Sequence, residues 1–303
     1  MKGKPLASLC ILFYKQEDFV EDTIKGALSQ TYDNLEIIIS DDNSPDGTFE
    51  RIQKAVKDYN GPHKVILNRN TKNMGLVPHL NKVLFELSSG DLLFLNGGDD
   101  ISIPDRVEKG VAYFTSQPDV TAVTFSRIVI DKTGKEIRKD KKEADSYVIV
   151  TDYSYLSSFS FMTGGVALSF RREVIQRFGP LLDNCPTDDS TWRFRAILMG
   201  KSVYSSHAGL KYRVHDNNIT RDIFKLKTNY IAEQYLNDIE KAKDWSDSRL
   251  CDILKEKVLF FKKERQYDEA ISKARIIGRY YYSFLKKQVE RNYKRKLKKN
   301  LAQ

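Results

Sequence analysis

The sequence predicts an α/β fold in which helices flank a mostly parallel central sheet. Through residues 5–130, short apolar runs of strand length alternate with segments of helical periodicity, as in successive strand–helix–strand units. The chain has 303 residues, of which 41% are hydrophobic and 11% aromatic, enough for one large core or two modest ones. Two of the apolar runs also stop at paired carboxylates, where open α/β sheets bind ligands.

Each element of the first half follows from its local pattern. Strands are expected where bulky and β-branched residues run together, and helices where apolar residues recur every three or four positions. The expected strands cover residues 9–13, 35–40, 65–68 and 92–95, with helices at 19–28, 48–59 and 77–87. Pro104 opens a further helix, because proline is tolerated in the first turn.

The pattern changes after residue 120 and again after residue 221. The elements expected there are a strand at 120–130, a turn at 131–134, helices at 172–178 and 188–199, and short strands at 202–206 and 210–214. Beyond them, only helical periodicity remains. We therefore predict one domain at 1–221, with halves at about 5–118 and 119–221, and a helical extension at 222–303.

The net charge of +9 lies entirely in this extension. Residues 1–221 hold 29 basic and 29 acidic side chains, whereas residues 222–303 hold 21 basic and 12 acidic ones. Near the end of the chain, Lys286 and Lys287 follow Tyr281 and Phe284, which indicates a basic amphipathic helix on an anionic membrane surface. A solvated, frayed end is the alternative. Nucleic acid is not expected as a partner, because the rest of the chain is neutral and carries no nucleic-acid motif.

The most informative motifs are the two acidic pairs. Asp41–Asp42 follows the apolar run 35–40, and Asp99–Asp100 follows the run 92–95 after two glycines. Because the carboxyl ends of parallel strands share one edge of the sheet, these pairs are expected to hold a nucleotide and a divalent cation such as Mn²⁺ or Mg²⁺. Local turn formation is the alternative for each motif.

Together these motifs resemble the family 2 glycosyltransferases, and the resemblance covers roughly residues 5–220. The residues that carry it, in the family's order, are 28–32, 41–48, Asn73–Gly75, Gly98–Asp100, Pro104–Arg106, Gly164–Gly165, Asp188–Asp189 and Tyr212–His215. The resemblance implies a GT-A fold with a Rossmann-like sheet. It also implies an inverting, metal-dependent transferase that takes a sugar from a nucleoside-diphosphate donor.

The resemblance assigns the donor side of the site. Asp42 would accept a hydrogen bond from the ring N–H of the base, and Asp41 would support the loop. Arg69, which follows the third expected strand, could hold the base or the pyrophosphate. Asp99 would contact the ribose or the metal, and Asp100 the metal. The family's Asp-x-Asp motif has Gly97 at its first position here, which is a departure.

His215 could complete the metal or phosphate site, since imidazole binds Mn²⁺ well. A structural histidine is equally consistent with the sequence, as is a solvated loop arginine at Arg69.

The resemblance also assigns the acceptor side. Asp189 matches the family's catalytic base, which takes the proton from the attacking hydroxyl, although a helix cap explains the same residue. Asp188, Trp192, Gly164 and Gly165 would contact the acceptor. For Trp192, a place in the core is the commoner explanation.

The resulting hypothesis is a hexosyl- or N-acetylhexosaminyltransferase using a nucleoside-diphosphate sugar, with UDP as the expected nucleotide. Its acceptor would be a glycan or lipid-linked glycan in surface polysaccharide or glycoconjugate synthesis. No apolar run approaches the ~18 residues of a spanning helix, and no secretory signal is evident, so we expect a cytoplasmic protein peripheral to the inner face of the cell membrane. A nucleotidyltransferase would show a glycine-rich basic phosphate loop, which is missing here. A degenerate, membrane-associated scaffold domain is the non-enzymatic alternative.

Overall fold

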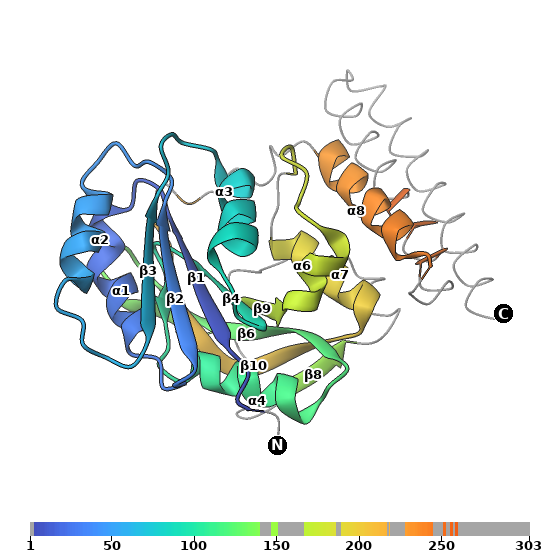
Figure 1. Cartoon of the computed structure of the whole chain (residues 1–303), viewed down its shortest axis with the longest axis horizontal. Helices are drawn as coiled ribbons and strands as arrows, with labels where there is room; N and C mark the ends of the chain where they lie inside the picture. Colours follow the sequence, from blue (N-terminus) through green and yellow to red (C-terminus); the bar gives the residue numbers. More distant parts are fainter. Residues whose placement is uncertain are drawn as a thin grey trace, which may run out of the picture.

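The computed structural model confirms the α/β architecture (Figure 1). It describes residues 3–139, 147–150, 167–185, 189–216, 218, 228–244, 251–252, 255–256 and 258–259. The pair Gly164–Gly165 and Asp188 lie outside these ranges, as does the basic end of the chain.

Four parallel strands form the first half of the sheet, in the order β3-β2-β1-β4. The strands are β1 (Ala7–Phe13), β2 (Leu35–Asp41), β3 (Lys64–Arg69) and β4 (Leu92–Gly97). The helices are η1 (Glu17–Phe19), α1 (Val20–Leu28), α2 (Thr48–Val56), α3 (Leu76–Lys82), the π-helical segment η2 (Val83–Leu87) and α4 (Arg106–Ser116). All the strands and helices expected in this half are present, with α2 ending three residues earlier than expected.

The second half of the sheet is mixed, and the order continues from β4 as β9-β6-β10-β5. Its strands are β5 (Ile101–Ser102), β6 (Val120–Ile130), β7 (Glu136–Lys139), β8 (Tyr147–Val150), β9 (Leu168–Arg171) and β10 (Lys201–Arg213). Its helices are α6 (Arg172–Phe178), α7 (Asp189–Met199) and α8 (Thr228–Ala242). Strand β9 runs antiparallel to both β4 and β6, so the sheet is parallel mainly in its first half.

Strand β10 corrects one expectation, because a single strand replaces the two short ones. Its ladder with β6 shifts register between Ser205 and Ala208 and again before Leu210. The shifts absorb extra residues as β-bulges do. Residues 207–209, which lay between the two expected strands, are therefore part of one continuous strand.

The sheet separates two hydrophobic cores, and the alternation of side chains along each strand assigns residues to them. In β1, Leu9 and Ile11 belong to the core under α1, α2 and α4. Cys10 belongs to the opposite core, which α3, α6, α7 and α8 cover. Figure 1 shows α1 and α2 on one side of the sheet and α3, α6 and α7 on the other.

Helix α8, from the predicted extension, is docked on α7. A fully buried ion pair joins Arg195 of α7 to Asp238 of α8, with the guanidinium Nε 2.8 Å from the carboxylate. The rings of Phe194 and Tyr235 stack at 4.2 Å between centroids, and Lys241 donates to the carbonyl of Phe178. Of the helices that the structure describes, none is both long and apolar enough to cross a bilayer.

Candidate active site

Both acidic motifs lie at the carboxyl edge of the parallel strands, as expected. The register pairs Phe13 of β1 with Asp41 on one side and Leu12 with Gly97 on the other. The pairs Asp41–Asp42 and Asp99–Asp100 therefore end the two strands that flank β1.

Asp41 is buried and bonded mainly within its own turn. It accepts hydrogen bonds from the backbone N–H of Ser44 at 2.9 Å and from the Ser44 hydroxyl at 2.5 Å. The Nε of Arg69 lies 3.7 Å from the same carboxylate. Burial nevertheless raises the pKa of Asp41, against the lowering effect of the Ser44 bonds and the Arg69 charge.

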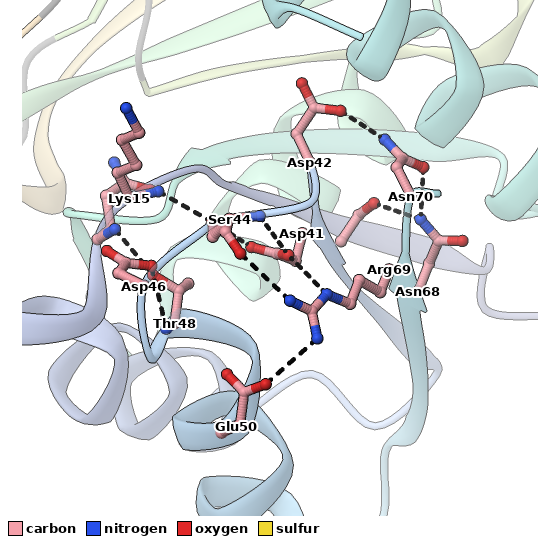
Figure 2. A network of polar contacts seen from close by, with 12 residues as sticks. Lys15, Asp41, Asp42, Ser44, Asp46, Thr48, Glu50, Asn68, Arg69 and Asn70 are labelled. Carbon is pink, nitrogen blue, oxygen red and sulfur yellow. Dashed lines mark hydrogen bonds and ion pairs between the residues drawn. The ribbon is translucent and has the colours of Figure 1, made fainter. Parts of the chain in front are cut away.

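Arg69 is held by several partners (Figure 2). It donates to the Ser44 carbonyl and to Glu50, and its guanidinium lies 5.0 Å from the centroid of the Phe49 ring. The structure thus brings Arg69 and Asp41 together, while the arginine side chain stays 35% exposed.

Asp42 holds the loop that precedes α3. Its Oδ1 accepts the backbone N–H of Met74 at 2.9 Å, and its Oδ2 accepts the backbone N–H of Gly75 at 2.9 Å. The side-chain amide of Asn70 donates to Oδ1 at 2.8 Å. The carboxylate is only 2% exposed, and most of its acceptor capacity is used within the protein.

Asp99 and Asp100 have fewer internal donors. Asp100, 1% exposed, accepts the backbone N–H of Arg213 at 2.9 Å. Asp99 contacts His215, with Nε2 2.9 Å from Oδ2. Burial raises the pKa of Asp100 well above its usual value and the Asp99 charge raises it further, while the Arg213 N–H and the Arg106 charge oppose the rise.

Two buried arginines, Arg213 and Arg106, contact the turn that carries Asp99 and Asp100. Arg213 donates through Nε to the carbonyl of Asp99 and through Nη1 to that of Lys132, and its Nη2 pairs with Asp22. Because it ties the end of β10 to the turn after β4, it places His215 beside Asp99. Phe19 packs against both, with its ring centroid 4.8 Å from the guanidinium and 4.8 Å from the imidazole.

Arg106 contacts residues on both sides of this turn. It donates to the side chains of Asn96 and Ser102, both at 3.0 Å. Asn96 in turn donates to the Asp100 carbonyl. Burial lowers the pKa of Arg106 to about 10, and the Asp100 charge counteracts that effect; a guanidinium with that pKa is still cationic at neutral pH.

Gly98 has a packing role. A side chain at this position would collide with the ring of Phe13 and with Gln16. The glycine therefore lets the turn after β4 lie directly against the end of β1.

The acceptor-side residues are only partly covered by the structure. Asp189 is the first residue of α7, so a helix does begin at the predicted base. Trp192 is fully buried and its ring stacks on that of Phe170, with 5.3 Å between centroids. The guanidinium of Arg195 lies 4.5 Å from the centroid of the Trp192 ring. The expected role of Trp192 in lining the acceptor surface is therefore wrong, because a side chain with no exposed area belongs to the core.

Residues that the sequence reasoning missed surround the predicted ones. Arg106 and Arg213 lay within motifs noted only for their spacing, and Asn70 and Asn96 were not singled out. For Asn70, Asn96 and Arg213, the signal would have been the position of a polar residue immediately after, or at the end of, a strand. Arg106, at the start of α4, carried no such signal.

The acidic side chains of the site form part of the donor set that a divalent cation needs. Within the described ranges, no three His, Cys, Asp or Glu side chains converge in a way that could hold an ion alone. Two adjacent carboxylates do, however, suit Mg²⁺ or Mn²⁺, which usually take one or two carboxylates and complete their shell with water and substrate phosphates. Asp99 and Asp100 are thus a donor set that fits a cation delivered with a diphosphate.

Comparison with known proteins identifies the family. Residues 8–179 match the family model described as glycosyl transferase family 2, and the chain belongs to that family. An uncharacterized glycosyltransferase of Haemophilus influenzae is 30% identical over 253 residues, covering 79% of this chain and 77% of that protein. The UDP-Glc:alpha-D-GlcNAc-diphosphoundecaprenol beta-1,3-glucosyltransferase WfaP of Escherichia coli is 30% identical over 127 residues, covering 42% of this chain and 47% of that protein.

Solved structures agree on the fold. The mannosyltransferase PcManGT of Pyrobaculum calidifontis, in complex with GDP-Man and Mn²⁺, superposes with a TM-score of 0.60 at 15% identity, over 99% of this chain and 85% of that one. TarS of S. aureus, residues 1–349 with UDP-GlcNAc, gives 0.68 at 12% identity, over 90% of this chain and 77% of that one. Other curated relatives are matched over 34–52% of their own length.

Proposed function

We propose that the protein is an inverting glycosyltransferase that moves a sugar from a UDP-sugar to a hydroxyl of a glycan or lipid-linked glycan. Membership of family 2 supplies the reaction class. The observation that carries the proposal is the meeting of the two acidic motifs at one edge of the sheet, on either side of β1. WfaP, by its name, uses UDP-Glc and a diphosphoundecaprenol-linked acceptor, which supports that donor and acceptor class.

Asp42 and Arg69 would bind the nucleotide. The Asp42 carboxylate accepts the base N–H, while Arg69 neutralises Asp41 and faces solvent with part of its side chain. Asp99 and Asp100 would hold the divalent cation, with His215 beside them. That cation, when bound, neutralises charge on the departing nucleoside diphosphate.

Asp189 would act as the catalytic base. A carboxylate at the start of a helix is favoured electrostatically by the helix dipole, and it can accept the proton of the acceptor hydroxyl as the oxygen attacks the anomeric carbon. Direct displacement of this kind inverts the anomeric configuration. Asp188, Gly164 and Gly165 remain predicted acceptor contacts.

Calorimetric titration of UDP tests the donor site, with and without Mn²⁺. We expect metal-dependent UDP binding by the intact chain and its loss in Asp100→Ala. Asp119→Ala is the matched control, because Asp119 is an exposed carboxylate that precedes β6 and pairs with Lys201. Metal-independent binding, or equal losses in both variants, would contradict the proposed metal site.

The basic end of the chain would bring the enzyme to anionic lipid, which would give a peripheral location at the inner membrane face. Each cation near an anionic surface contributes about 1 kcal/mol. Removal of residues 270–303, which hold 11 basic residues and one acidic residue, should abolish sedimentation with anionic vesicles. Unchanged sedimentation of the truncated protein would contradict this part of the proposal.

A further inference from the structure

A chain of polar side chains leads from Asp42 to Asn70 and on to Asn68 (Figure 2). The parallel register pairs Asp41 with Arg69, so the next residues of the two strands, Asp42 and Asn70, become neighbours. Asn70 continues the ladder through its backbone N–H to the Asp41 carbonyl at 2.9 Å. Its side chain is 3% exposed and donates to Asp42.

The orientation of the Asn70 amide follows from the chemistry of its partners. Its Oδ1 accepts from the ammonium of Lys82 at 2.8 Å and from the amide of Asn68 at 3.1 Å. Lys82 can only donate, and an ionised Asp42 can only accept. A reversed amide would place oxygen against carboxylate and NH₂ against ammonium, so only one orientation satisfies both ends.

The chain continues into the interior and is anchored there. Asn68 also donates to the Ser40 hydroxyl at 2.9 Å, and that hydroxyl lies 2.6 Å from Nε2 of His79. Burial lowers the pKa of His79 to about 4, so the imidazole is neutral at neutral pH. The polar chain is thus built from β2, β3 and α3, and Lys82 is the cation closest to Asp42 within it.

We propose that Asn70, oriented by Lys82, is a positioning residue that fixes the Asp42 carboxylate and thereby sets the selectivity of the site for the nucleotide base. This rests on the proposed function, in which Asp42 accepts a ring N–H of the base. Uracil has that N–H and cytosine does not. A carboxylate held by Asn70 on one oxygen, by the Gly75 N–H on the other and by the Met74 N–H on both is a fixed acceptor for the ring N–H of uracil, which cytosine lacks.

Calorimetry with UDP and CDP tests the proposal on the intact chain in the presence of Mn²⁺. Asn70→Leu removes the amide at similar size, and we expect the Kd for UDP to rise about tenfold, as for a lost hydrogen bond to a charged group. The Kd for CDP should change less than twofold. Lys82→Met should raise the Kd for UDP about threefold, and Lys82→Arg, which keeps a donor, should restore it.

The double variant distinguishes a shared pathway from two separate effects. If Lys82 acts through Asn70, adding Lys82→Met to Asn70→Leu should weaken UDP binding no further. Lys57→Met, at an exposed lysine after α2, is the control for loss of a charge. Equal weakening of UDP and CDP, or unchanged UDP binding in both single variants, would overturn the proposal.

Asp42→Asn separates this proposal from the proposed function. Loss of the preference for UDP over CDP in Asp42→Asn, together with a normal preference in Asn70→Leu, would overturn the role of Asn70 and leave the base contact intact. An unchanged preference in Asp42→Asn would overturn the base contact itself.

Discussion

Asp41–Asp42 and Asp99–Asp100 end two strands that lie on either side of β1, but their carboxylates have different surroundings. The first pair is bonded to N–H and hydroxyl donors from its own turn, from the loop before α3 and from Asn70. In the second pair, Asp100 accepts a backbone N–H from Arg213 and lies beside a second carboxylate.

The difference separates a rigid recognition element from a site that needs a counter-ion. Several N–H donors from the protein fix the position of the carboxylates in the first pair, which leaves Asp42 oriented for the proposed base contact. Two adjacent carboxylates with fewer donors repel one another, and a divalent cation relieves that repulsion. Four predictions from three substitutions would break or sharpen this comparison.

The largest effect is expected on catalysis at the second pair. Asp100→Asn removes a charge that would hold the cation, and kcat/KM should fall by roughly 100- to 1,000-fold, or about 3–4 kcal/mol. Steady-state assays with the preferred UDP-sugar measure this, with Asp119→Asn as the control. A loss of less than threefold would mean that the second pair does not hold the catalytic metal.

The next effect is on stability at the first pair. Asp42→Asn replaces one accepting oxygen with a donor NH₂ that faces the N–H groups of Met74 and Gly75. An unsatisfied buried donor costs about 1–3 kcal/mol, and urea unfolding should show a loss of that size. Asp33→Asn, at a carboxylate whose side chain is 74% exposed, should change little. An unaltered urea midpoint for Asp42→Asn would show that the loop does not depend on this carboxylate.

The opposite sign is expected for the stability of Asp100→Asn. The pKa of Asp100 is raised from 3.8 by burial and then by Asp99, so the folded state binds this proton more tightly than the unfolded state. The wild type therefore loses stability as pH rises above about 4, through the raised pKa of the folded state. The asparagine variant lacks this loss and should be more stable by about 1 kcal/mol at pH 7.

Thermal unfolding at several pH values measures this difference. The curves of the variant and the wild type should converge as the pH falls below the ordinary value of 3.8, where the carboxyl of Asp100 is protonated in both states. Curves that run parallel throughout would contradict the electrostatic account of the second pair.

The smallest effect is expected at Arg69. Its ion pair with Asp41 spans 3.7 Å and its side chain is 35% exposed, so solvent screens the interaction. Arg69→Met should cost less than about 1 kcal/mol in urea unfolding. A cost comparable with that of Asp42→Asn would mean that Asp41 depends on this arginine more than on the Ser44 bonds.

Much of the fold was predictable from local pattern. Strands β1, β2 and β4 are short apolar runs with residues on both faces buried, and local composition identifies such runs without reference to the rest of the chain. The same runs placed Asp42 and Asp100 at strand ends. For β10, local pattern failed, because the bulges that keep it continuous depend on its ladder with β6.

The sequence by itself determined the family, the order of the first four strands along the chain, and the two acidic pairs at one edge of the sheet. It could do so because strand length, helical period and short motifs are local properties. Tertiary structure alone decided what each side chain touches. The register of β2 and β3 placed Asn70 against Asp42, and the end of β10 brought Arg213 and His215 to the turn of Asp99. It also assigned Trp192 to the core, because burial depends on segments that are distant in the chain.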